Sequence, residues 1–156
     1  MTKTNAVRLI EQAGLPCRTA EYEYDENDLN GMHAAKAIGM PSEQVFKTLV
    51  ARGDRSGILI FCIPVCCELD LKKAAKAAKD KKVDLVAMKE LLPLTGYIRG
   101  GCSPVGMKRS YPTYIDETAQ LYDEIAVSAG MRGQQLLISP DDLIHYADMT
   151  VCDLTE

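Results

Sequence analysis

Glycines are concentrated in one stretch of the chain that could bind an anion. Residues 96–106 read Gly-Tyr-Ile-Arg-Gly-Gly-Cys-Ser-Pro-Val-Gly and hold four of the eleven glycines. Backbone without a Cβ can adopt positive φ and bring its N–H groups close to a ligand. Neighbouring amides then form a partly positive hollow for a phosphate, a carboxylate or a developing oxyanion. Ser103 would add a hydroxyl donor. From the spacing alone, a glycine-rich corner without a ligand is an equal alternative.

Lys47 is a second candidate, because it interrupts the apolar segment 45–51. Side chains alternate between the two faces of a strand, so Val45, Lys47 and Leu49 would share one face. If that face points inward, the ammonium is partly desolvated and needs an anion. The pattern alone favours the other interpretation, in which Lys47 lies on the solvent face or marks the edge of a sheet.

Composition narrows the class of protein. The 156 residues, 47% hydrophobic and 26% charged, are typical of one soluble globular domain spanning residues 1–156. A net charge of −4 argues against a general nucleic-acid coat protein but allows a local basic face. The six cysteines show no paired zinc spacing, and only His33 and His145 could complete a metal site. We therefore expect reduced thiols, no metal and no cofactor.

The ends and apolar runs of the chain predict a cytoplasmic location. The first residues lack the apolar core of a signal peptide. The longest apolar run, residues 58–67, is about half of what a membrane span needs. We expect no membrane partner, and the sequence leaves the oligomeric state open.

The elements that must position these residues follow an irregular order. Helices are predicted where a capping residue precedes helix formers, and strands where apolar residues alternate or run together. Because strands and helices do not alternate regularly, we expect an α+β domain whose mixed sheet curls toward a barrel, flanked by short helices. The predicted helices cover residues 5–13, 33–38, 71–79, 89–94 and 140–147, and the predicted strands 17–24, 45–51, 58–65, 83–86, 112–115, 124–128, 134–138 and 149–154.

Five motifs in register resemble the YbaK/EbsC family over nearly the whole chain. They are Val45-Phe-Lys-Thr-Leu, Leu71-Lys-Lys-Ala-Ala, Thr95-Gly-Tyr-x-x-Gly-Gly-x-Ser-Pro-x-Gly, Val127-Ser-Ala-Gly-x-Arg-Gly and Ile138-Ser-Pro-Asp-Asp-Leu. The family is similar to the editing domain of bacterial prolyl-tRNA synthetases, and its best-known members hydrolyse Cys-tRNA(Pro) in trans. The resemblance implies a metal-free, barrel-like α/β domain, an aminoacyl-tRNA substrate and prolyl-tRNA synthetase as a candidate partner.

The resemblance also implies roles for individual residues. Lys47 matches the lysine that holds the acceptor end of the tRNA or the anionic groups of the substrate, with Phe46 and Thr48 beside it. Catalysis would use Lys47 together with Gly101 and Ser103, which belong to the glycine-rich loop. The substrate-binding set is completed by Tyr22, Gly100, Ser128, Gly130 and Asp142, although Asp141 matches the acidic position equally well. Cys66-Cys67 departs from the expected junction between strand and helix.

Chemistry agrees with this function independently of the family. An aminoacyl ester is activated, so a deacylase needs positioning and an oxyanion hole more than a strong nucleophile. In the Cys-tRNA enzymes the thiol of the substrate attacks its own carbonyl, which would explain why no Ser-His-Asp set is visible. A nucleophilic Cys102 is disfavoured because neither histidine is placed to serve as its base.

Six lysines fall within residues 72–82, a density that usually marks a solvated helix face. With a tRNA substrate they would contact phosphates. The predicted tRNA-binding residues are Lys72, Lys73, Lys76, Lys79, Arg99 and Lys108. Two alternatives remain open at this point: a deacylase for another mischarged tRNA such as Ala-tRNA(Pro), and a non-catalytic module that binds a tRNA end or a synthetase.

Overall fold

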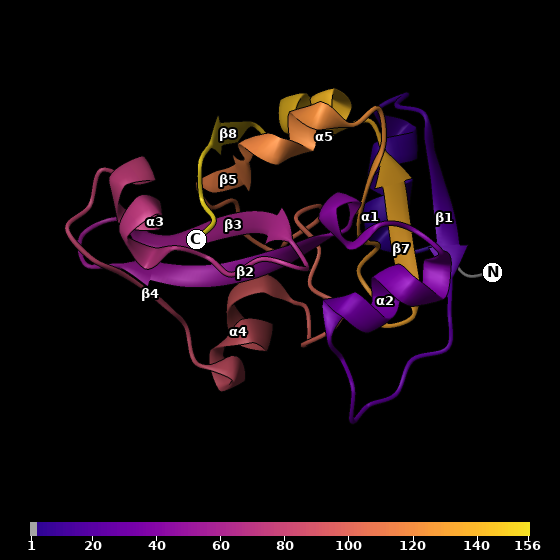
Figure 1. Cartoon of the computed structure of the whole chain (residues 1–156), viewed down its shortest axis with the longest axis horizontal. Helices are drawn as coiled ribbons and strands as arrows, with labels where there is room; N and C mark the ends of the chain where they lie inside the picture. The colour runs from indigo at the N-terminus through magenta and orange to yellow at the C-terminus, as the bar shows by residue number, and fades with distance from the viewer. Residues whose placement is uncertain (1–2) are drawn as a thin grey trace.

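The chain folds into two β-sheets with helices packed around them (Figure 1), as seen in a computed structural model that describes residues 3–156. The helices are α1 (Asn5–Gln12), α2 (Gly31–Ile38), α3 (Leu71–Ala77), α4 (Leu91–Thr95) and α5 (Pro140–Tyr146). The strands are β1 (Cys17–Glu21), β2 (Phe46–Gly53), β3 (Gly57–Pro64), β4 (Val83–Leu85), β5 (Thr113–Asp116), β6 (Ile125–Ser128), β7 (Gln134–Ile138) and β8 (Met149–Cys152).

Capping residues explain where the helices begin and end. The side chains of Thr4, Asn30, Asp70 and Ser139 each accept a hydrogen bond from a first-turn amide of α1, α2, α3 and α5. Gly39 ends α2 in the left-handed conformation, with φ of 72°. The five predicted helices are therefore confirmed, with ends that differ by a few residues.

The larger sheet is mixed and has the order β4-β2-β3-β5-β8. Its centre is a hairpin, in which β2 and β3 pair antiparallel from Phe46 opposite Pro64 to Gly53 opposite Gly57. β5 pairs with β3 and with β8 in parallel. β4 pairs with β2 only over Ala51–Gly53, so the first half of β2 has β3 on one side and no strand of this sheet on the other.

The smaller sheet is antiparallel, with the order β1-β7-β6. It meets the larger sheet through one parallel bridge, between Val45 and Ala126. The predicted α+β class is confirmed, but the expected curl toward a barrel is not: the strands of residues 3–156 form two sheets that do not close on each other. A barrel needs continuous strand pairing around its circumference. Here the two sheets are joined by a single β-bridge rather than by a ladder of paired residues.

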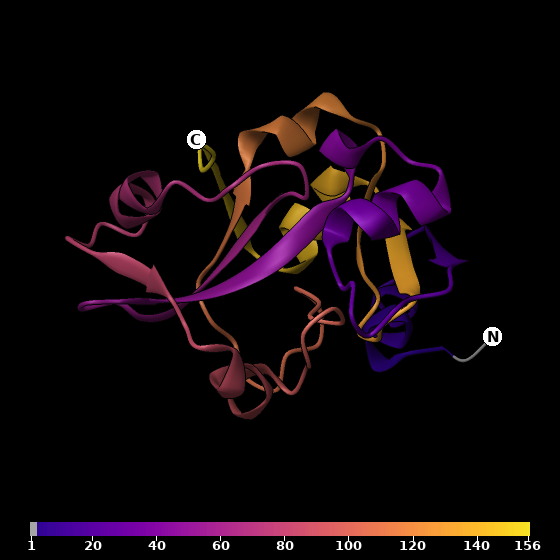
Figure 2. The same cartoon turned by 60° about the horizontal axis from the view of Figure 1, so that its bottom comes forward.

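The main core lies between the two sheets and under α1 and α5, where Ile10, Ile60, Ile125 and Leu143 are almost fully buried. A second cluster lies between α3 and the opposite face of the β2–β3 hairpin. α3 and α2 lie at opposite ends of that hairpin in both views (Figure 2). None of the described helices is long and apolar enough to cross a membrane.

Candidate active site

A cavity of about 670 Å³ opens beside the first half of β2, which pairs with β3 alone. Its walls come from β2, the start of α2, the segment from β4 to α4, the glycine-rich loop and the adjoining strands β6 and β7. Among the lining residues are Tyr22, Gly31, Met32, Phe46, Lys47, Thr48, Leu85, Met88, Arg99, Gly100, Cys102, Ser128 and Gln135. Segments distant in sequence therefore meet at the point where the larger sheet is incomplete.

Lys47 is the cation on the strand side of this cavity. Its side chain is 28% exposed, and its Nζ lies 4.0 Å from Oε1 of Glu68, whose side chain is 81% exposed. At that distance and exposure the ion pair contributes little stability. The ammonium can therefore exchange Glu68 for the anionic group of a ligand at low cost.

Strand alternation also turns backbone groups toward the cavity. The carbonyl of Val45 accepts a hydrogen bond from Val65, on the β3 side, whereas the carbonyl of Val50 accepts one from Val86, on the β4 side. Alternate residues of an antiparallel strand direct their N–H and C=O groups to the same side. The backbone groups of Thr48 consequently face the same side as those of Val50, where β4 has already ended.

The glycine-rich loop contributes only some of its predicted residues to the cavity lining. Gly100 and Cys102 line the cavity, whereas Gly101 and Ser103 do not. The amide of Gly101 donates to the carbonyl of Ile98, at 3.0 Å. The Oγ of Ser103 is fully buried and accepts from the amide of Val105, at 3.2 Å. Gly101 and Ser103 therefore stabilise the conformation of the loop, whereas their neighbours Gly100 and Cys102 line the cavity.

Close packing explains two of the glycines. A Cβ on Gly101 would lie 3.2 Å from the backbone of Met131 and Arg132. A Cβ on Gly31, at the start of α2, would lie only 2.4 Å from a methyl carbon of Val65. Both glycines therefore allow two chain segments to approach more closely than a side chain would permit.

The thiol of Cys102 is protonated at neutral pH. Burial raises its pKa to about 12, and burial likewise raises the pKa of nearby Cys62 to about 12. A nucleophilic cysteine needs a lowered pKa. The structure thus gives no support to a thiolate at Cys102, in agreement with the sequence.

Gln135 is a cavity residue that sequence reasoning missed. It is 6% exposed, pairs with Ser128 across β6 and β7, and its Oε1 is buried without a hydrogen-bond partner. A buried acceptor in this state is costly unless a ligand satisfies it. The available signal was a pair of glutamines at the start of an otherwise apolar strand, at 134 and 135. Ser128 lies opposite; its Oγ accepts from the amide of Gly130, at 3.1 Å, which leaves its hydrogen to donate.

The remaining predicted residues lie outside the cavity lining. Gly130 stands behind Ser128 and packs against the ring of Tyr97. Asp141 and Asp142 are in the first turn of α5, where the amide of Asp142 donates to Ser139. Tyr22, Phe46, Thr48, Gly100, Ser128 and Arg99 do line the cavity, together with Lys47.

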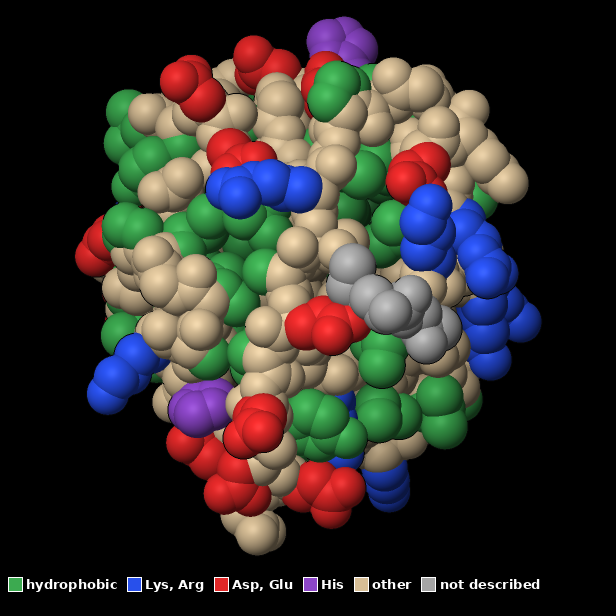
Figure 3. Space-filling model, turned by 90° about the vertical axis from the view of Figure 1, so that its right-hand side faces the viewer, with side chains coloured by type: hydrophobic (Ala, Val, Ile, Leu, Met, Phe, Trp, Pro, Cys, Tyr) green, Lys and Arg blue, Asp and Glu red, His purple; other side chains and the backbone are tan. Residues whose placement is uncertain are grey.

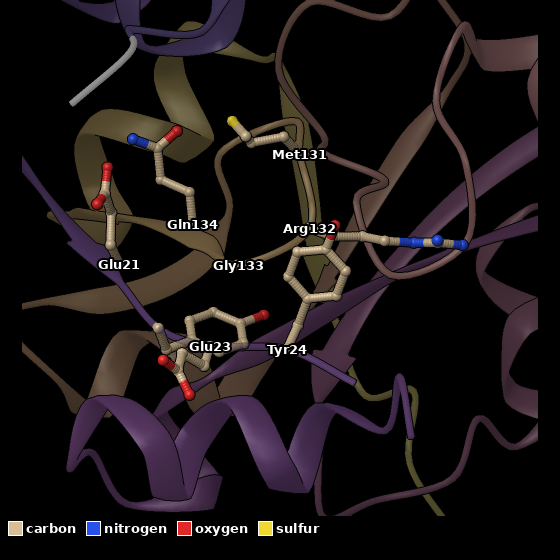
Figure 4. Close-up of a pocket in the computed structure, with 8 residues that line it drawn as sticks. Glu21, Glu23, Tyr24, Met131, Arg132, Gly133 and Gln134 are labelled. Atoms are coloured by element: carbon tan, nitrogen blue, oxygen red, sulfur yellow. The ribbon is translucent and has the colours of Figure 1, made fainter. Parts of the chain in front are cut away.

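A smaller hollow of about 410 Å³ lies beyond Tyr22, between the end of β1 and the turn before β7 (Figure 4). Glu21 and Glu23 project on one side of it, and Tyr24 lies beside Arg132 on the other. The Nε of Arg132 already donates to the carbonyl of Arg99, at 2.8 Å. With two carboxylates beside its one guanidinium, this hollow suits an anionic ligand less well than the larger cavity.

Charge is distributed unevenly around the molecule. Acidic side chains gather at the lower end of the face shown in Figure 3. The exposed residues Glu23, Asp25, Glu26 and Asp28 belong to the loop between β1 and α2, and exposed Glu21 ends β1. The lysines of α3 lie at the other end of the hairpin. A polyanion approaching the cavity is therefore repelled from one end and attracted to the other.

A two-sheet α+β fold with a cavity that pairs a lysine with a glycine-rich loop defines a domain suited to an anionic ester or phosphate ligand. The model of the aminoacyl-tRNA editing domain matches residues 32–146. The chain is 43% identical, over 98% of its length and 93% of the relative, to an Enterococcus faecalis protein named "Putative Cys-tRNA(Pro)/Cys-tRNA(Cys) deacylase EbsC". The chain belongs to the aminoacyl-tRNA editing family.

Solved structures agree with this assignment. The "crystal structure of a putative trans-editing enzyme for prolyl tRNA synthetase" superimposes with a TM-score of 0.83 at 27% identity, covering 97% of this chain and 92% of that one. The structure of "hypothetical protein APE2540" shares the fold, with a TM-score of 0.86 at 23% identity over 96% and 97% of the two chains.

Proposed function

We propose that the protein is a trans-editing deacylase that hydrolyses the ester of Cys-tRNA(Pro). The observation that carries the proposal is the shared cavity of Lys47, the glycine-rich loop and the unpartnered amide oxygen of Gln135. The names of the Enterococcus relative and of the trans-editing structure support the choice of substrate and of prolyl-tRNA synthetase as a partner. The reaction needs no cofactor.

Each cavity residue has a role in this proposal. Lys47 holds the anionic acceptor end of the tRNA in exchange for Glu68. Backbone amides at Gly100 and Cys102, rather than at Gly101, face the developing oxyanion, an interaction that elsewhere is worth about 3 kcal/mol per donor. The Oε1 of Gln135 accepts a hydrogen bond from the α-ammonium of the aminoacyl group, and the hydroxyl of Ser128 donates to the ester. Tyr22, Phe46 and Thr48 enclose the amino acid.

The body of the tRNA would lie toward α3 and away from the acidic loop. Lys72, Lys76 and Lys79 are exposed and can contact phosphates. Lys73 is a weaker candidate, because its Nζ already binds the carbonyl of Thr155 at 2.6 Å and Asp153 at 3.0 Å. Arg99 stands at the cavity, and Lys108 packs its aliphatic stem against Gly96.

Incubation with tRNA(Pro) charged with cysteine, alanine or serine tests the proposal. We expect cysteine to be released fastest, with Ala-tRNA(Pro) as the competing substrate. Faster release of alanine would show that the substrate is Ala-tRNA(Pro) rather than Cys-tRNA(Pro), while the proposed reaction, ester hydrolysis, would stand. Ester hydrolysis no faster than in buffer, together with measurable tRNA binding, would show a non-catalytic binding module and overturn the proposal.

A further inference from the structure

Two adjacent cysteines stand at the rim of the proposed active site. Cys66 is exposed and lines the cavity, and its Sγ lies 3.8 Å from the Sγ of Cys67. Both thiols belong to the turn that follows β3, in which the amide of Cys67 donates to the carbonyl of Pro64 at 3.0 Å. The catalytic scheme above uses neither thiol.

The turn is held at both ends and is adjustable between them. On one side the amide of Val65 donates to Val45, at 2.8 Å, directly before β2. On the other side Leu69 forms a bridge with Thr155. Glu68, the residue after the two cysteines, is the ion-pair partner of Lys47. A change in the turn at residues 66–67 therefore acts on the position of Glu68 and on Lys47.

We propose that Cys66 and Cys67 form a reversible redox modification site that inactivates the deacylase when a small disulfide oxidises it. The inference rests on the proposed function for its effect on activity, but not for its chemistry. The thiolate of Cys66 attacks one sulfur of oxidised glutathione and releases one glutathione thiolate. The thiolate of Cys67 then attacks Sγ of Cys66 and releases the second. Two protein thiols are oxidised, one glutathione disulfide is reduced, and the two thiol protons pass to the released glutathione.

Geometry makes such a bond labile. The sulfurs must close from 3.8 Å to about 2.0 Å. Adjacent Cα atoms across a trans peptide are about 3.8 Å apart, shorter than the usual spacing of about 4.4–6.8 Å in disulfides. Strained disulfides have more oxidising potentials and are readily reduced. Closure therefore has to deform the turn, and a thiol reductant should reverse it.

The order of attack follows from exposure. Cys66 is the more accessible sulfur and meets the external disulfide first. Burial and the neighbouring Cys66 raise the pKa of the Cys67 thiol, whereas the Lys47 ammonium opposes that shift. Cys67 is thus a resolving thiol whose attack accelerates as the pH rises.

Oxidised glutathione is the probe for the test, and it is removed before any assay because cysteinyl-tRNA also carries a thiol. We expect the peptide 56–72 to lose the mass of two hydrogens. The rate of Cys-tRNA(Pro) deacylation should fall about tenfold to a hundredfold, the scale of a small misplacement of catalytic groups, and dithiothreitol should restore it. Cys67→Ser should instead retain one glutathione on Cys66, and Cys66→Ser should resist oxidation. Cys17→Ser and Cys152→Ser are matched controls at partly exposed, isolated thiols and should respond like the wild type.

A persistent glutathione adduct on wild-type Cys66, no reaction, or a disulfide that leaves deacylation unchanged would each overturn the proposal. If the reduced enzyme does not deacylate any charged tRNA, the proposed function fails by itself. The modification site is then judged by the peptide mass and by amide hydrogen exchange over residues 45–49 and 64–70. Oxidation should alter amide hydrogen exchange in these two segments, and unaltered exchange would refute the proposed modification site.

Discussion

The two halves of β2 belong to one strand and have different environments. Its second half, Ala51–Gly53, lies between β3 and β4, and Ala51 is fully buried against Leu59 and Phe61. Its first half pairs with β3 alone and carries Lys47 and Thr48 on the cavity. The half that is paired on both sides is built for stability, whereas the half that pairs with β3 alone keeps a charged side chain and backbone groups available to a ligand. Substitutions in the two halves should therefore affect different properties.

Replacing Lys47 with alanine should give the largest effect. We expect deacylation of Cys-tRNA(Pro) to fall about a hundredfold to a thousandfold, because the cation facing the acceptor end is lost. The free energy of unfolding should change by less than about 0.5 kcal/mol, because the ion pair with Glu68 is long, at 4.0 Å, and the Glu68 side chain is exposed. Single-turnover rates measure the loss of deacylation, and urea unfolding measures the change in stability. Lys36→Ala, on the exposed side of α2, is the control; an equal loss of activity there would refute the role of Lys47.

Ala51→Leu should have the opposite profile. Extra methyl groups in a filled core cost about 1–3 kcal/mol, and Ala51 has no exposed surface. Urea unfolding should show that loss, while the activity of the folded fraction stays within about twofold. A large loss of activity without a loss of stability would contradict the division between the two halves.

Gln135→Leu should separate binding from stability at the far wall of the cavity. Removing an unpartnered buried acceptor is expected to leave stability unchanged or slightly raised. Losing its hydrogen bond to the substrate ammonium should raise KM about tenfold, since hydrogen bonds to charged groups are worth about 1.5–3 kcal/mol. Gln135→Glu keeps an acceptor, so its KM should stay near that of the wild type; a KM as high as that of Gln135→Leu would refute the contact.

Neutralising Lys72, Lys76 and Lys79 together should weaken tRNA binding modestly. If each contacts a phosphate, the slope of log affinity against log salt should fall by about 0.7–0.9 per lysine. Filter binding at several salt concentrations measures this slope. An unchanged slope would place the tRNA elsewhere on the surface.

Cys102→Ala should have the smallest effect on catalysis, within about twofold. Because its pKa is raised to about 12, the wild-type thiol carries a proton at pH 7 and is no nucleophile. The unfolded thiol ionises near pH 8.5. The folded protein therefore retains a proton that the unfolded chain loses, and stability should fall as the pH rises above about 8.5. Urea unfolding at increasing pH should show a smaller fall for Cys102→Ala than for the wild type.

Local signals made much of the fold predictable. The caps at Asp70 and Ser139 and the apolar run of β3 define their elements within a few neighbouring residues. The separation into two sheets was not predictable, because it depends on β5 pairing in parallel with both β3 and β8 and on one bridge at Val45. Such long-range pairing leaves no periodic signal in the sequence.

Only part of the candidate site could be anticipated from the sequence. Lys47 was a candidate because its charge interrupts an apolar segment, although the pattern alone favoured a solvent-facing lysine, and the structure places it in the lining of the cavity. The sequence identified the glycine-rich loop as part of the site, but it did not show which of its residues face the cavity. A change of one residue in the course of the backbone would place Gly101 in the lining instead of Gly100. Gln135 was missed because a glutamine in a strand resembles any solvent-facing polar residue until its burial is known.

The tight contact between Gly31 and Val65 limits how the specificity of this enzyme could diversify. Any larger residue at position 31 would collide with Val65, so α2 and the turn after β3 form a wall of fixed spacing. A second wall, formed by the segment from β4 to α4, carries Leu85 and Met88, which are 51% and 61% exposed and can change size freely. Adaptation to a bulkier amino acid should therefore accumulate substitutions at the second wall and conserve the glycine of the first.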